Sequence, residues 1–175
     1  MTRLLPPLLS LAALLAGCQT MDERPSERLG QAMLHYSDGS PAGTARLIGT
    51  GDRIDISLAL AAAPPGEHGL HLHTTGDCRP PDFASAGGHL NPEGRQHGHE
   101  NPDGAHLGDL PNAIVNHSGS ATVSAALPGS RDAVLAHIFD ADGTSIVLHD
   151  TRDDYRTDPA GDSGRRIACG VFTPD

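Results

Sequence analysis

The sequence predicts an all-β fold, an antiparallel sandwich or barrel, and three observations support this. The 175 residues include 21 Gly and 14 Pro but no Trp, a composition that favours short strands and many turns over long helices. Several short runs alternate apolar and polar residues, which is the period of a half-buried strand. Turn signals such as "SDGSPAG", "PPGE" and "ADGT" separate these runs. The length suits one compact domain.

The clearest strand is "DRIDISLAL", in which the even-numbered residues from Ile54 to Leu60 share one apolar face. The run "SATVSAAL" repeats the pattern with the odd-numbered residues from Ala121 to Leu127. Further strands are expected, in chain order, at 31–36, 44–48, 68–73, 111–115, 145–149 and 166–171. The run 132–139, "DAVLAHIF", fits either a strand or a single helical turn, and the pattern leaves both open.

Two long stretches, 74–109 and 150–165, show no strand period. A long loop in a compact domain is usually either disordered or functional. The first stretch contains "HL", "HGHE" and "HLGD", and clustered imidazoles favour a functional loop. The chain has 11 His in total, an excess that indicates metal binding.

The pair His71 and His73 in "HLH" is the first candidate metal site. On a strand, residues two apart point to the same face, so the two rings can bind one metal ion. Other candidate ligands in the sequence are His89, His97, His106, Asp109 and His149. Imidazole suits copper and zinc, and a carboxylate suits zinc.

The N-terminus indicates export. Arg3 precedes an apolar run that ends at Ala16, which is too short for a membrane span of about 20 residues and fits a secretory signal. The ending "LAGC" resembles the lipobox of bacterial lipoproteins, in which the cysteine, here Cys18, carries the lipid. The alternative is an ordinary signal peptide with an unrelated cysteine.

The expected organisation is therefore a lipoprotein signal peptide at 1–17, a flexible tether at 18–29 and a folded domain at 30–175. Gln19 after the lipidated cysteine favours anchoring to the outer membrane, and we expect the domain in the bacterial periplasm. In an oxidising compartment the remaining Cys78 and Cys169 favour a disulfide over two free thiols.

Charge excludes one class of partner. The chain has 22 acidic and 12 basic residues and a formal charge of -10, whereas nucleic-acid binding through phosphates needs basic patches. We expect no nucleic-acid partner, and membrane contact only through the lipid anchor at Cys18. Whether the protein is a monomer or a homodimer is left open.

The chain resembles the copper/zinc superoxide dismutases, especially their secreted bacterial branch, over residues 31–172. The motifs that carry the resemblance are "HGLHLH", "GDC", "SAGGHLNP", "HGHENPDGAHLGDLPN", "IVLHDTRDDY" and "GRRIACGV". The resemblance implies an eight-stranded antiparallel Greek-key β-barrel or sandwich, immunoglobulin-like, with long metal-binding and active-site loops. It also implies an oxidoreductase that converts superoxide to dioxygen and hydrogen peroxide by cycling copper between Cu(II) and Cu(I).

The resemblance assigns residues to the two cofactors, copper and zinc. The copper ligands it implies are His71, His73, His89 and His149. The zinc ligands it implies are His89, His97, His106 and Asp109, with the imidazolate of His89 bridging the two ions. Arg166 matches the arginine that guides the superoxide anion, so Arg166 and His89 are the expected catalytic residues. Asp153 matches the carboxylate that links a copper-bound and a zinc-bound imidazole. Cys78 and Cys169 match the disulfide that holds the long loop near Arg166.

This sequence also departs from the family. Relatives often use Lys to attract superoxide, whereas all basic residues here are Arg, so Arg152, Arg156 and Arg165 are the candidates to replace it. Arg165 is expected to be a solvated neighbour of the guiding arginine. We expect His68 to be structural and His99 to be exposed.

Two other functions are compatible with parts of this sequence. One is a copper- and zinc-binding buffer or scaffold without efficient turnover, but storage needs neither Arg166 nor a bridging His89. The other is a zinc hydrolase, which needs an open zinc position with an activated water. Four protein ligands would close that position.

Overall fold

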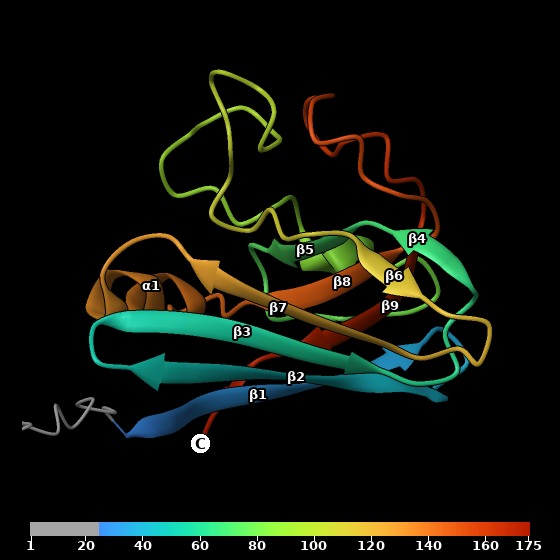
Figure 1. Ribbon diagram of the computed structural model, residues 1–175, viewed down its shortest axis with the longest axis horizontal. Coiled ribbons are helices and arrows are strands. Elements are labelled where there is room, and N and C mark those ends of the chain that lie inside the picture. The colour runs from blue at the N-terminus through green and yellow to red at the C-terminus, as the bar shows by residue number, and fades with distance from the viewer. Residues whose placement is uncertain (1–24) are drawn as a thin grey trace, which may run out of the picture.

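The computed structural model describes residues 25–175 as an antiparallel β-sheet that curls around one main apolar core (Figure 1). The strands are β1 (Ser26–Tyr36), β2 (Pro41–Thr50), β3 (Arg53–Leu60), β4 (Gly66–His68), β5 (Leu70–His73), β6 (Ala113–Val115), β7 (Ala121–Leu127), β8 (Ser145–His149), β9 (Arg166–Val171) and β10 (Thr173–Pro174). One helix, α1 (Arg131–Ile138), and a 3-10 turn at Ala84–Ala86 complete the regular structure of this part of the chain. The all-β prediction is confirmed.

The main sheet has the order β5-β8-β9-β1-β2-β3-β7, with β10 beside β1, and β4 pairs with β6 in a separate two-stranded sheet. Every pairing is antiparallel. In this order β9, which comes near the end of the sequence, lies between β1 and β8. The expected signal peptide and Cys18 lie outside the described residues, and within residues 25–175 no helix has the length and hydropathy that a membrane crossing needs.

The core follows the alternation read from the sequence. On β3, Ile54, Ile56 and Leu58 are all buried, while Arg53, the first residue of the strand, is exposed. Strand β7 pairs with β3 and turns Val123 inward. Burial of such side chains away from water is the main stabilising term for a sheet of this kind.

The first strand begins earlier than expected. The polar composition and missing period of Ser26 to Leu29 predict that these residues belong to the tether, but they form part of β1. Glu27 and Arg28 pair with the far end of β2, and the Arg28 guanidinium lies 2.9 Å from the carboxylate of Asp175. Pairing with a neighbouring strand, rather than burial of a face, makes this segment regular, so an amphipathic pattern does not reveal it.

The open assignment at 132–139 resolves as a helix. Ser130 precedes α1, and its hydroxyl accepts a hydrogen bond from the backbone N–H of Ala133 at 3.4 Å. Asp132 lies in the first turn, where a negative charge favours the helix.

The expected strand at 68–73 is interrupted at Gly69. The Gly69 N–H donates to the carbonyl of Thr151 at 2.8 Å, and a Cβ at this position would lie 2.7 Å from the side chain of Ser163. Only glycine permits this close approach of the 150–165 segment to the sheet. As a result β4 turns away to pair with β6, while β5 remains in the main sheet.

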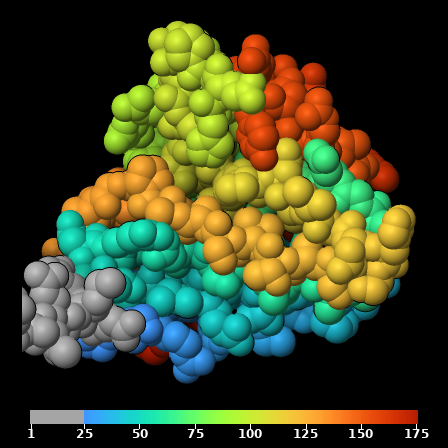
Figure 2. Space-filling view, viewed as in Figure 1, coloured from blue at the N-terminus to red at the C-terminus, as the bar shows by residue number. Residues whose placement is uncertain are grey.

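The two irregular stretches stand together above β5 and β8, outside the curled sheet (Figure 1). In the space-filling view they form the yellow-green and orange-red protrusions at the top of the molecule (Figure 2). We call 74–109 the first loop and 150–165 the second loop. They are joined by an ion pair between Glu100 and Arg156 at 2.6 Å, and by a 2.7 Å hydrogen bond from the His97 backbone N–H to Asp158.

Candidate metal centre

Three buried imidazoles of the site come from two neighbouring strands. His71 and His73 lie on β5, two residues apart, and His149 ends β8 beside it. His89 from the first loop joins them through a bridge to His73, and its ring stacks on that of His71 with centroids 3.9 Å apart. The sequence prediction that these four residues meet therefore agrees with the geometry.

Each strand-borne ring is fixed through one nitrogen. His71 donates from Nε2 to Asp153 at 2.8 Å, His73 from Nδ1 to the carbonyl of Gly87 at 3.0 Å, and His149 from Nδ1 to the carbonyl of Gly164 at 3.3 Å. Such contacts fix the tautomer and leave the other nitrogen as an acceptor.

The free nitrogens are the strongest sign of a metal. Five buried ring nitrogens within the described residues have no hydrogen-bond partner, namely His71 Nδ1, His73 Nε2, His89 Nε2, His97 Nδ1 and His149 Nε2. A buried polar atom without a partner costs free energy, so such atoms need a ligand that supplies the missing interaction. Four of them belong to residues of the first donor group, in which one ligand atom from each residue lies within 4.8 Å of the others (His71, His73, His89, His149).

A second set of donors converges on one oxygen of Asp109. Its Oδ1 lies 3.0 Å from Nδ1 of His89, 3.0 Å from Nδ1 of His97 and 3.2 Å from Nδ1 of His106. The contact with His97 is close but lacks hydrogen-bond geometry, so His97 Nδ1 remains among the partnerless nitrogens. Its Oδ2 accepts hydrogen bonds from the backbone N–H groups of Gly98 and His106, each at 2.9 Å. The backbone thus holds the carboxylate so that Oδ1 faces the three rings, and these donors suit zinc.

The second group of four donors within 4.8 Å of one another consists of His71, His89, His97 and Asp109. It contains His71 where the sequence predicts His106. His106 is nevertheless in place, because its Nδ1 lies 3.4 Å from Nδ1 of His89. The residues present therefore fit two adjacent metal ions, one among imidazoles alone and one among imidazoles and a carboxylate.

Asp153 joins the two groups. Its side chain is fully buried, and its two oxygens accept hydrogen bonds from Nε2 of His71 at 2.8 Å and from Nε2 of His97 at 2.9 Å. Burial raises the pKa of this carboxyl, but hydrogen bonds from the two rings outweigh that effect and hold the pKa well below its usual range. Asp153 therefore stays ionised and acts as an acceptor for both rings.

Burial and charge also set the imidazole pKa values. Burial lowers the pKa of His89 to about 4 and that of His149 to about 3. Burial likewise lowers the pKa of His97, but the carboxylates of Asp109 and Asp153 outweigh it and raise the pKa to about 9. Neutral rings are the form that binds metal ions.

Arg166 lies across the strand pair from His149, on β9. Its guanidinium donates to the carbonyls of Phe83 at 2.7 Å and Gly87 at 2.6 Å. The Gly87 carbonyl is the same acceptor that fixes His73, so one backbone oxygen positions both the cation and a ring of the first group. The first loop thus holds Arg166 beside the imidazoles.

Two arginines of the second loop form ion pairs with carboxylates. Arg165 is mostly exposed and lies 2.8 Å from the carboxylate of Asp150, as expected of a solvated neighbour. Arg156 pairs with Glu100. Arg152, Arg156 and Arg165 are the candidates to replace lysine, and carboxylates therefore partly neutralise the last two.

Cys78 and Cys169 form a disulfide that joins the first loop to β9, three residues beyond Arg166. The bond lies in a small buried cluster with Phe83 and Val147. It anchors the part of the loop that supplies both carbonyls to the Arg166 guanidinium.

His68 makes structural contacts and His99 is exposed, as the sequence predicts for each. The His68 ring nitrogens lie 2.8 Å from the carbonyl of His149 and 2.9 Å from that of Pro64, so this ring joins backbone segments. His99 is exposed, and its Nε2 donates to the backbone carbonyl of Asp109 at 3.0 Å.

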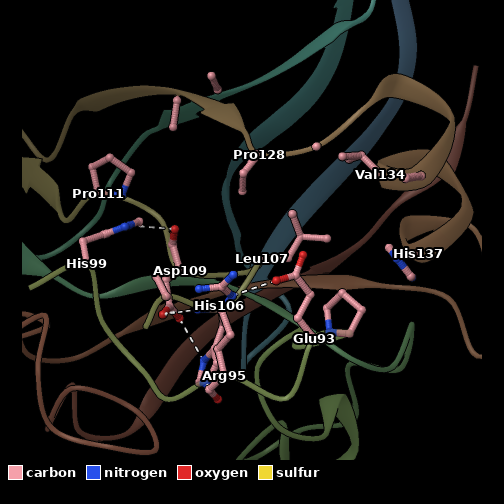
Figure 3. Close-up of a pocket in the computed structure, with 16 residues that line it drawn as sticks. Glu93, Arg95, His99, His106, Leu107, Asp109, Pro111, Pro128, Val134 and His137 are labelled. Atoms are coloured by element: carbon pink, nitrogen blue, oxygen red, sulfur yellow. Dashed lines mark hydrogen bonds and ion pairs between the residues drawn. The ribbon is translucent and has the colours of Figure 1, made fainter. Parts of the chain in front are cut away.

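A cavity of about 570 Å³ lies on the outer side of the second group, between the first loop, β7 and α1. His106 and Asp109 form part of its wall beside Arg95, and His137 lies on the far side (Figure 3). The Arg95 carbonyl accepts from Nε2 of His106 at 3.1 Å, which fixes this ring with Nδ1 toward Asp109.

Several groups that orient the metal-site side chains cannot be recognised in the sequence. The carbonyls of Gly87, Gly164 and Arg95 orient imidazoles, but a backbone oxygen leaves no mark on residue type. Asn112 and Tyr155 contact Asp153. The only available signal was that Asn112 ends the "DLPN" motif.

Removing the metals is expected to make the domain acid-sensitive. The pKa values of His89 and His149 lie below the unperturbed 6.5, so the unfolded chain binds more protons and the free energy of unfolding falls as pH drops from 6.5 toward 4. The lowered pKa of Asp153 extends this loss below pH 3.8. His97, with its raised pKa, adds the opposite effect, a loss as pH rises through about 9.

Denaturant midpoints of the chelator-treated protein at a series of pH values would measure this. A midpoint that stays constant between pH 6.5 and 4 would contradict the expectation.

Comparison with known proteins agrees with this geometry. The family model described as copper/zinc superoxide dismutase matches residues 42–172. A Cu-Zn superoxide dismutase of Aquifex aeolicus is 41% identical over 148 residues, which cover 81% of this chain and 84% of the relative. The crystal structure of a superoxide dismutase-like protein from Bacillus subtilis has a TM-score of 0.73 at 36% identity, covering 81% of this chain and 96% of that one. The Cu/Zn superoxide dismutase from Brucella abortus has a TM-score of 0.66 at 26% identity, covering 84% and 99%. The chain belongs to the copper/zinc superoxide dismutase family.

Proposed function

We propose that His71, His73, His89 and His149 bind copper, that His89, His97, His106 and Asp109 bind zinc, and that His89 bridges the two ions. The protein is a superoxide dismutase with copper and zinc as cofactors. The observation that carries the residue assignment is the set of partnerless buried nitrogens, four of which belong to the proposed copper ligands.

Bound copper supplies the one-electron couple by which one superoxide is oxidised to dioxygen and a second is reduced to hydrogen peroxide. The protein must then attract a small anion, hold it and deliver protons. His89 Nε2 is buried and lacks a protein partner, so this atom can take up a proton and return it to the reduced substrate. Its Nδ1 faces Asp109, which keeps the ring in place while the proton moves.

Arg166 is the proposed binding group for superoxide. Two backbone carbonyls hold its guanidinium, so the cation is already oriented when the anion arrives. Asp153 is the proposed acceptor for one ring of each site, His71 on the copper side and His97 on the zinc side, and it fixes the orientation of both rings.

The test is metal content together with superoxide turnover, measured on the purified domain. We expect one copper and one zinc per chain, one for each group of donors, and rapid catalysed decay of superoxide. Full metal loading without turnover would support a metal buffer instead.

Replacing Arg166 with leucine is expected to lower kcat/KM by roughly tenfold or more, because a fixed cation beside the site raises the encounter rate of an anion. Arg165→Leu is the matched control, since this side chain is solvated and paired with Asp150. Raising the ionic strength to about 0.15 M, where the Debye length is roughly 8 Å, should slow the wild type more than Arg166→Leu. A wild-type rate that does not change with salt would count against local attraction.

We further propose that the first 17 residues are a lipoprotein signal and that Cys18 carries the lipid, with the domain in the periplasm at the outer membrane. The "LAGC" motif and a disulfide in the domain, which suits an oxidising compartment, support this. Because β1 begins at Ser26, seven residues separate Cys18 from the first strand, and at roughly 3.5 Å per residue they can span at most about 25 Å.

Fractionation of cells that express the full chain, with mass spectrometry of its mature N-terminus, tests the anchor. We expect the wild type in the outer-membrane fraction with a lipid-modified Cys18 at its mature N-terminus. Cys18→Ser should leave that fraction, and recovery of both forms in the soluble periplasm would exclude the anchor.

A further inference from the structure

The backbone of Asp153 is held by a residue outside its own loop. Its oxygens contact two rings of the metal centre, yet the second loop, from which it comes, contains no helix or strand. Tyr155 contributes one local contact, a hydrogen bond from its backbone N–H to Asp153 Oδ1 at 2.7 Å. The loop has backbone hydrogen bonds of its own, from Asp154 to Gly161 at 2.9 Å and from Thr151 to Ser163 at 3.1 Å, but neither uses the N–H or C=O of Asp153.

Asn112 supplies contacts to these two groups. Its side-chain Nδ2 donates to the Asp153 carbonyl at 2.9 Å, and its Oδ1 accepts from the Asp153 N–H at 2.8 Å. One amide thus satisfies both backbone groups of Asp153. The Asn112 backbone N–H in turn donates to the Tyr155 hydroxyl at 2.8 Å, which adds a third bond between the two segments.

The position of Asn112 makes these bonds a link between the scaffold and the site. Asn112 directly precedes β6, which pairs with β4, and follows the proposed zinc ligand Asp109 by three residues. It therefore joins the two-stranded sheet, the end of the zinc-binding segment and the second loop.

We propose that Asn112 is a positioning residue, which acts through Asp153 to hold the His71 and His97 rings in the orientation that metal binding requires. This rests on the proposed function of Asp153. Asparagine suits the task because its side chain carries a donor and an acceptor in one plane, matching the N–H and C=O of a backbone residue. Aspartate keeps only the acceptor, and alanine keeps neither.

The experiment compares Asn112→Ala with Asn101→Ala in protein loaded with zinc and copper(I). Asn101 is the matched control because its amide also supports the first loop, donating to the His97 carbonyl at 3.1 Å, but does not contact Asp153. NMR would follow the two imidazole N–H protons that point at Asp153, those on Nε2 of His71 and His97.

In Asn112→Ala both N–H signals should shift and exchange with water about tenfold faster, because a loosened acceptor weakens both hydrogen bonds. Zinc should be lost to a competing chelator about tenfold more readily. In Asn101→Ala both N–H signals should stay as in the wild type. Asn112→Asp, which retains one of the two bonds, should change the signals less and in the same direction, and it serves as the test if the alanine variant does not fold.

Unchanged signals in the Asn112 variants, or equal changes in Asn101→Ala, would overturn the inference. Asp153→Asn separates the two levels of the argument. If Asp153→Asn alters both signals and the Asn112 variants do not, only the inference on Asn112 fails. If Asp153→Asn leaves both signals unchanged, the proposed function of Asp153 fails, and the inference on Asn112 fails with it.

Discussion

Replacing His89 with alanine is expected to abolish superoxide turnover, lowering the catalysed rate by more than about a hundredfold. This ring is the one ligand that the proposed copper and zinc sites share, and it belongs to both groups of donor atoms, as His71 also does. Its removal therefore disrupts both proposed sites together. Loss of a group that only orients a metal ligand costs roughly 10–100-fold, and loss of a shared ligand should cost more. Superoxide decay, followed with metal content on the same samples, provides the measurement.

His99→Ala is the control for that experiment. This imidazole comes from the same loop, but it is exposed and its Nε2 contacts a backbone carbonyl. Turnover in His99→Ala should stay close to the wild-type rate. Substantial turnover in His89→Ala at full metal loading would contradict the proposed bridge.

Removing the disulfide is expected to have the largest effect on stability. Cys78 and Cys169 are 91 positions apart, and closing a loop of that length stabilises a folded chain by about 4–5 kcal/mol if the effect comes from unfolded-chain entropy. Cys78→Ser with Cys169→Ser should lower the free energy of unfolding by this amount. Denaturant titration of metal-free samples measures the effect without a contribution from metal binding.

The same variant should also lose zinc and copper more readily. Phe83 and Gly87, whose carbonyls hold Arg166, lie in the segment that the disulfide anchors. Wild-type protein treated with a thiol reductant should behave like the double variant. Equal unfolding free energies for the oxidised and reduced forms would refute the prediction.

The sequence predicts the strands with strict alternation well, because burial of one face fixes their residue types. Ile54 to Leu60 on β3 is such a case, and the structure confirms it. The donor residues are also visible in the sequence, because imidazoles in "HLH" and in the first loop have no reason to cluster in an ordinary core.

Other features carry no such mark. Ser26 to Leu29 form a strand through backbone pairing with β2, which does not constrain side-chain type. The break at Gly69 depends on the second loop, which is distant in sequence. Asn112 contacts Asp153, which is 41 positions away in the sequence. A single asparagine before a short strand does not indicate which distant residue its side chain will bind.

The donor atoms differ in the kind of backbone that carries them. His71, His73 and His149 belong to strands within a hydrogen-bonded ladder, so their arrangement exists as soon as the barrel has folded. His97 and His106 lie in a segment with no strand ladder of its own, and Asp109 is paired to the sheet by an isolated bridge to His71. For that segment we expect zinc binding to contribute folding free energy, because a metal site that forms only in the folded chain couples affinity for the ion to folding. Assembly of the proposed centre is therefore expected in two stages, in which the sheet preforms one half and zinc binding completes the other.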